Sequence, residues 1–96
     1  MPRVLPMPAG PHANAMLGVL ATNADNSSYF FVSDVHVPRS EDDAPSAARA
    51  ATECWFADWA VSALPEDTQV VNSHSAVVTP LSRLHAYLVS DTCKNL

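Results

Sequence analysis

Residues 43–84, DAPSAARAATECWFADWAVSALPEDTQVVNSHSAVVTPLSRL, decide the fold of this chain. Residues 47–64 contain no Pro or Gly, and Ala, Trp and Phe recur at spacings of three and four, which is typical of a helix. Pro65 ends this helix, and the oxygens of Asp42 and Asp43 are suited to cap its start. The stretch therefore begins with a long, well-bounded helix.

A strand and a second helix are predicted after it. Residues 68–72 (TQVVN) form a short β-branched run between turn residues, which indicates a buried strand. Residues 76–89 follow the helical period. Pro80 leaves two alternatives open: it kinks this helix if Ser75 is the cap, or it is a favourable first residue if the helix begins at Thr79.

Upstream of the long helix the pattern favours strands. The apolar run in residues 14–22 and the aromatic, β-branched run in residues 29–37 predict a hairpin, and residues 3–5 add at best an edge strand. Because a helix connects the hairpin to the next strand, that strand should lie parallel to a hairpin strand. The predicted fold is α/β, or mixed α+β, with a small sheet of three to four strands and two helices in the order (β)ββαβα.

Length and charge limit the possible functions. With 96 residues, 48% of them hydrophobic, the chain is expected to form one compact domain at 14–90, preceded by an extended or disordered arm at 1–13 and followed by a tail at 91–96. The net charge is −5, and Lys94 is the single lysine. Duplex nucleic acid is bound through basic side chains, so we expect no such binding and favour a basic partner.

The cysteines and the apolar runs bear on location. Cys54 in the main helix and Cys93 in the tail predict two free thiols and a reducing compartment. No apolar run approaches the roughly 20 residues that span a bilayer, and the first residues hold too many prolines for a secretory signal. We therefore expect a soluble, cytoplasmic protein without membrane contact.

Two pieces of the central stretch resemble the ribonuclease H-like domain of retroelement and retroviral polymerases. Thr52-Glu53 followed by Trp59-Ala60-Val61 is similar to the family's helix that carries a catalytic Glu, and residues 70–81 are similar to its fourth strand and following helix. The hairpin upstream occupies the place of the family's second and third strands. The resemblance implies a ribonuclease H-like fold for most of the chain.

The catalytic carboxylates of that family are mostly missing. Two-metal hydrolysis needs a cluster of carboxylates around two divalent cations, and Glu53 is the one match. Ser73 or His74 stands where the family has an Asp at the strand end, and residues 3–12 hold no first-strand Asp. The resemblance therefore implies a non-catalytic domain that needs no cofactor and acts through protein contacts.

A second resemblance opens an enzymatic alternative. Residues 31–37 (FVSDVHV) are similar to the first metallophosphoesterase motif, in which an Asp and a His at a strand end bind one metal of a pair. Asp34 and His36 share one face of the predicted strand. Asn72 and His74 resemble the family's later Asn-His pair. This alternative is a metal-dependent phosphoesterase or nuclease remnant that uses Mg²⁺ or Mn²⁺, with the candidate residues Asp34, His36, Glu53 and His74.

The main helix also predicts an interface. Its large aromatic residues spread over more than a third of its circumference, which one side of a small sheet does not cover. We therefore expect a homodimer or a protein complex, with the aromatic helix and an acidic loop as contact surfaces: Trp55, Phe56, Trp59, Glu41, Asp42 and Asp43. A further alternative is an acidic inhibitor of viral or phage type that occupies a basic nucleic-acid site on a host protein.

Overall fold

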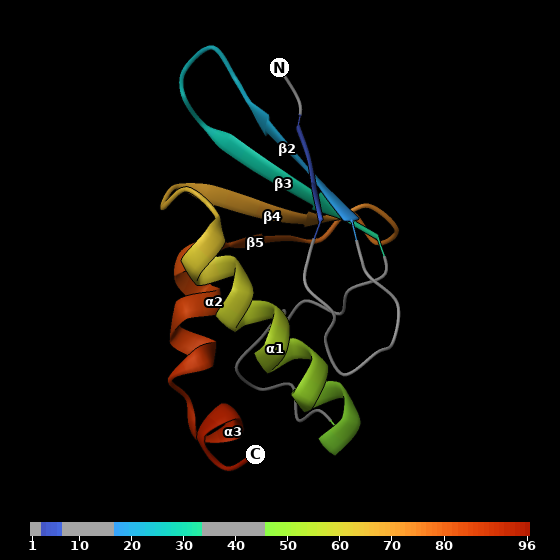
Figure 1. Ribbon diagram of the computed structural model, residues 1–96, viewed down its shortest axis with the longest axis vertical. Coiled ribbons are helices and arrows are strands. Elements are labelled where there is room, and N and C mark those ends of the chain that lie inside the picture. The colour runs from blue at the N-terminus through green and yellow to red at the C-terminus, as the bar shows by residue number, and fades with distance from the viewer. Residues whose placement is uncertain (1–2, 7–16, 34–45) are drawn as a thin grey trace.

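The computed structural model describes residues 3–6, 17–33 and 46–96. Within these ranges five strands form one sheet, and the helices gather along one side of it (Figure 1). In chain order the elements are β1 (Arg3–Pro6), β2 (Leu17–Thr22), β3 (Ser28–Val32), α1 (Ala47–Ala63), β4 (Thr68–Asn72), β5 (Val78–Pro80), α2 (Leu81–Leu88) and α3 (Asp91–Lys94).

The strands follow one another across the sheet in the order β1-β2-β3-β4-β5. All neighbours are antiparallel except β3 and β4, which are parallel and are connected through α1. The hairpin, the crossover helix and the mixed α+β fold predicted from the sequence are thus confirmed. β1 forms the edge strand foreseen at residues 3–5, and β5 is an additional strand. The rest of the predicted arm, and residues 34–37 of the predicted long strand, lie outside the described residues.

Helix α1 has the predicted extent, but its cap is different. The Ser46 hydroxyl oxygen accepts a hydrogen bond from the backbone N–H of Arg49 at 3.3 Å, which satisfies one of the free donors of the first turn. At the other end the N–H of Leu64 donates to the Ala60 carbonyl at 3.0 Å, and Pro65 follows. Asp42 and Asp43, the predicted caps, lie outside the described residues.

The second helix begins later than predicted. Residues 78–80 pair with β4 instead of forming the first turn, and Pro80 is the N-cap of α2, so no proline lies inside the helix. The cause lies in the preceding turn, where the Asn72 side-chain oxygen accepts from the N–H groups of His74 at 3.0 Å and Ser75 at 3.2 Å. This turn reverses the chain and lets the β-branched residues after it extend the sheet.

The hydrophobic core lies between the helices and one face of the sheet. Phe30 at the centre of β3 is fully buried, and its ring centroid lies 5.5 Å from that of Trp59 in α1. Helix α2 packs along α1 and closes the core at its side (Figure 1). The buried members of this cluster come from β2, β3, β4, α1, the residue after α1 and α2: Leu20, Phe30, Val32, Val70, Phe56, Ala57, Ala60, Leu64, Leu81 and Leu84.

The last residues, predicted as a tail, form the short helix α3, which contacts both α1 and α2. A disulfide joins Cys93 of α3 to Cys54 of α1, with their Cα atoms 5.7 Å apart. The prediction of two free thiols is therefore wrong. The two cysteines are 39 residues apart in sequence, and they meet because α2 leads the chain back along α1.

Candidate functional site

Glu53, the residue that matched the catalytic Glu of the ribonuclease H-like family, is buried in α1 with a relative exposure of 1%. Its Oε1 accepts a hydrogen bond from Nε of Arg49, one helical turn earlier, at 3.0 Å. A buried carboxylate needs such a charged donor, because burial without one is costly. The pair therefore gives Glu53 a structural role within α1.

His74 lies in the exposed turn between β4 and β5. Its backbone N–H bonds the Asn72 side chain, so the Asn-His pair singled out in the sequence forms the turn itself. Within residues 3–6, 17–33 and 46–96, no three His, Cys, Asp or Glu side chains lie close enough together to hold a metal ion. Asp34 and His36 lie outside the described residues, so the phosphoesterase and nuclease alternative stays a prediction.

The three aromatic residues of α1 differ in their surroundings. Phe56 is fully buried in the core, and the Trp59 ring lies against it with centroids 6.1 Å apart. Trp55 and Trp59 are half-buried and pack against the same core. The acidic loop residues Glu41, Asp42 and Asp43 lie outside the described residues.

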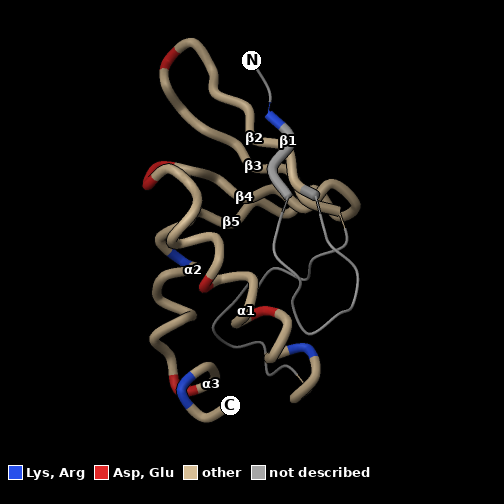
Figure 2. Tube along the Cα trace, viewed as in Figure 1, with Lys and Arg blue, Asp and Glu red and all other residues tan. Residues whose placement is uncertain are grey.

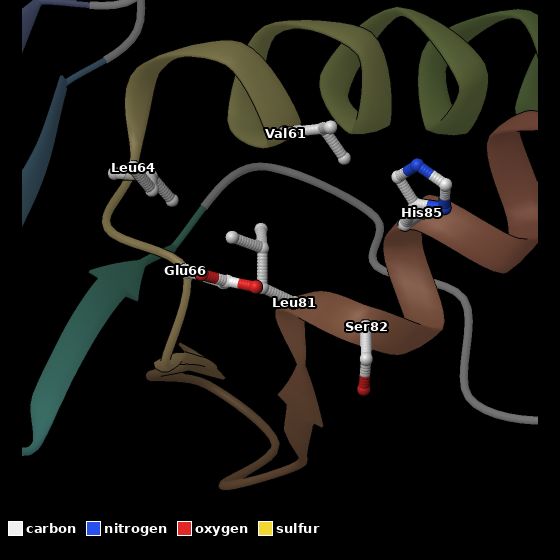
Figure 3. A pocket seen from close by; sticks show the side chains of 6 residues that line it. All are labelled: Val61, Leu64, Glu66, Leu81, Ser82 and His85. Atoms are coloured by element: carbon white, nitrogen blue, oxygen red, sulfur yellow. The ribbon is translucent and has the colours of Figure 1, made fainter.

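A groove of about 410 Å³ opens between the end of α1 and the start of α2 (Figure 3). Buried Leu64 and Leu81 and half-buried Val61 provide its apolar lining, while exposed Glu66, Ser82 and His85 provide polar groups. In Figure 3 the Ser82 hydroxyl points away from His85 and from Glu66. The three polar groups therefore do not form a nucleophile with its base.

The opposite face of the sheet carries a surface that the sequence analysis missed. Successive residues of a strand point to opposite faces, so Phe31 points away from the core that Phe30 fills, and it is 38% exposed. Phe31 lies beside Val19 of β2 and Val71 of β4, and Val71 lies beside Val78 of β5, which is 51% exposed. One apolar row thus crosses four strands.

A second row runs next to it. Tyr29 stacks against Phe31 with ring centroids 6.4 Å apart, and it lies between Ala21 and Gln69. We call the two rows together the open face, and none of its residues is charged: Val19, Ala21, Tyr29, Phe31, Gln69, Val71, Val78 and Pro80. The signal was present in the sequence, since β3 (SYFFV) is apolar on both of its faces while the helices cover one face.

Acidic residues lie at one end of this sheet. Asp25 is in the turn between β2 and β3, and Glu66 and Asp67 precede β4, where Ser28 and Thr68 are neighbours (Figure 2). Oδ1 of Asp25 accepts hydrogen bonds from the Ser27 hydroxyl at 2.6 Å and from the Ser27 N–H at 3.0 Å. These bonds lower the pKa of Asp25 below its usual 3.8.

No family model, curated protein or solved structure matches this chain. The ribonuclease H-like relationship therefore stays a prediction. None of the helices in the described ranges is long and apolar enough to span a bilayer.

Proposed function

We propose that this chain is a small non-catalytic domain, of ribonuclease H-like type, that acts through protein–protein contacts made by the open face of its sheet. The main support for this proposal is the uncharged apolar row across β2, β3, β4 and β5, in which Phe31 and Val78 are 38% and 51% exposed. An apolar sheet face is normally covered by a second layer, and an exposed apolar patch with polar surroundings marks an interaction site.

The proposed contact surface thus moves from the aromatic helix to the sheet. Phe56 is fully buried, and the two tryptophans pack against the core. The edges of the sheet are less suited to binding, because β1 and β5 end in Pro6 and Pro80, and proline does not donate to an added strand. The face, and not the edge, is therefore the surface we propose.

A second copy of the chain is the partner we propose. Because the open face is uncharged, two copies meet there without bringing like charges together, despite the net charge of −5. A two-fold axis across the strands reverses their direction and places the acidic ends, with Asp25, Glu66 and Asp67, at opposite ends of the pair. The face has fewer residues than the 20–30 per side of a standard interface, so we expect a weak, concentration-dependent dimer.

Val78 and Val89 provide a matched test. The two valines are similarly exposed, at 51% and 53%, but Val78 lies on the open face and Val89 follows α2. Sedimentation velocity over a range of concentrations should show a dimer that Val78→Lys abolishes and Val89→Lys leaves unchanged. A monomer at every concentration, or equal effects of the two substitutions, would contradict a dimer through this face.

A further inference from the structure

Helix α3 has little of its own to hold it in place. It is four residues long, none of its residues is buried, and no side chain caps its start. The Ser90 hydroxyl, which stands at the cap position, donates instead to the Tyr87 carbonyl at 2.6 Å. Helices this short are unstable unless something outside them fixes their ends.

The Cys54–Cys93 disulfide fixes α3 to the rest of the protein. Cys54 lies in the middle of α1 with a relative exposure of 7%, and Cys93 is half-buried in α3. Neither cysteine belongs to the hydrophobic cluster between the sheet and the helices. The bond therefore joins a short peripheral helix to the middle of α1, and the cluster that packs the sheet against α1 and α2 includes neither sulfur.

We infer that this disulfide is a redox-sensitive clasp: closed, it holds α3 against α1 and α2, and when it is reduced α3 is released while the sheet, α1 and α2 stay folded. This inference is independent of the proposed dimer. It predicts a local response to reduction instead of global unfolding.

The reaction is thiol–disulfide exchange with a dithiol. One thiolate of the dithiol attacks a sulfur of the pair, the S–S bond breaks, and the other cysteine leaves as a thiolate. The second thiol of the reagent then displaces the first cysteine and closes a disulfide in the reagent. Two electrons and two protons thus pass to Cys54 and Cys93, which become thiols.

The clasp also bears on location. Disulfides persist in oxidising compartments and are kept reduced in the cytosol, so the clasp is closed in the former and open in the latter. The prediction of a reducing compartment was made from two free thiols. Because Cys54 and Cys93 are paired, that prediction loses its support. Transfer from an oxidising to a reducing compartment would release α3.

The test compares the oxidised protein with the protein reduced by dithiothreitol. Amide hydrogen exchange should accelerate at least tenfold on reduction at residues 94–96, whose N–H groups bond to the carbonyls of Ser90, Asp91 and Cys93, while residues 28–32 and 68–72 keep their protection. Carboxypeptidase should digest past Cys93 in the reduced protein and stop before Cys93 in the oxidised protein. Cys93→Ser, without reductant, should reproduce both results, and Val89→Ser should reproduce neither.

Three outcomes would overturn the inference. Unchanged exchange in α3 after reduction would show that non-covalent contacts hold the helix. Simultaneous loss of protection in β3 and β4 would show that the disulfide maintains the whole fold. Resistance of the bond to dithiothreitol under native conditions would show that it is not redox-sensitive, whatever the behaviour of the Cys93→Ser variant.

Discussion

The ring of Phe30 occupies the space that a Cβ at position 18 would fill, since a Cβ built on Gly18 collides with the far end of that ring. Gly18 lies in β2, diagonally across from Phe30 in β3. The absence of a side chain at this position lets the Phe30 ring extend over the neighbouring strand. The packing of the sheet centre therefore depends on this pair.

Gly18→Ala is expected to lower the free energy of unfolding by about 2 kcal/mol, because the new Cβ would force the fully buried Phe30 ring to shift within the packed core. Urea denaturation measures the effect. In a double-mutant cycle with Phe30→Leu, the smaller side chain should relieve part of the clash. The double variant should therefore lose less free energy of unfolding than the sum of the losses in the two single variants. Simple additivity would show that the two residues do not compete for space.

The sequence predicts the elements whose pattern is strong and local. Helix α1 and strand β4 were found at their observed positions because the period of residues 47–64 and the β-branched run of residues 68–72 leave few alternatives. Residues 76–80 misled the prediction, since Val77 and Val78 fit a helical period and a strand equally well. The turn at Asn72 favours the strand over the helix. It is held by side-chain hydrogen bonds, which the spacing of apolar residues does not reveal.

Features of the candidate site depend on contacts between distant residues. The disulfide brings together Cys54 and Cys93 through the path of α2, which residue spacing does not reveal. Glu53 matched a catalytic position, yet its partner Arg49 is the residue one turn earlier, a spacing that is equally typical of a structural pair. The open face became visible once the register placed Val19, Phe31 and Val71 side by side.

Arg49→Ala is expected to lower the free energy of unfolding by about 2 kcal/mol, because the buried Glu53 carboxylate loses a charge-assisted hydrogen bond. Arg83→Ala removes the same type of side chain from an exposed position of α2 and should change stability by less than about 0.5 kcal/mol. Equal effects of the two substitutions in urea denaturation would contradict a structural role for the Arg49–Glu53 pair.

Ala76→Gly is expected to stabilise the protein. Ala76 has φ 58°, in the left-handed region, which costs a residue with a Cβ about 1–2 kcal/mol. Glycine adopts this conformation freely, and its greater freedom in the unfolded chain offsets part of the gain, so we expect a net increase of about 0.5 kcal/mol. The same substitution at Ala86, exposed in α2, should instead cost about 1 kcal/mol. If Ala76→Gly and Ala86→Gly both destabilised the protein, the proposed backbone strain at Ala76 would be contradicted.

Asp25 gives a pH dependence with a defined sign. Its pKa is lowered in the folded protein, first by the Ser27 hydroxyl and then by the Ser27 N–H. A carboxyl with a lowered folded pKa stabilises the fold above its usual value of 3.8, and this contribution is lost as the pH falls through the folded pKa. NMR titration should place Asp25 below 3.8, and Ser27→Ala should raise its pKa toward that value. An unchanged pKa in the variant would exclude the Ser27 hydroxyl as the main cause.

Phe30 and Phe31 are neighbours in sequence whose substitutions should have opposite consequences. Phe30 is fully buried and Phe31 is 38% exposed on the open face. Phe30→Thr leaves a cavity and buries a hydroxyl in the core, so it should lower the free energy of unfolding by about 3–5 kcal/mol. Phe31→Thr keeps a β-branched residue in the strand and should change the stability of the monomer by less than about 1 kcal/mol.

For self-association we expect the reverse: Phe31→Thr should have the large effect and Phe30→Thr the small one. Phe31→Thr removes the central aromatic ring of the open face and should weaken dimerisation at least tenfold, measured by sedimentation equilibrium at concentrations where the protein is folded. Phe30→Thr, examined at a temperature where it remains folded, should dimerise as the unchanged protein does, because its side chain lies on the other side of the sheet. Dimerisation that survives Phe31→Thr but is lost with Phe30→Thr would show that the contact lies elsewhere and depends on the packing of the core.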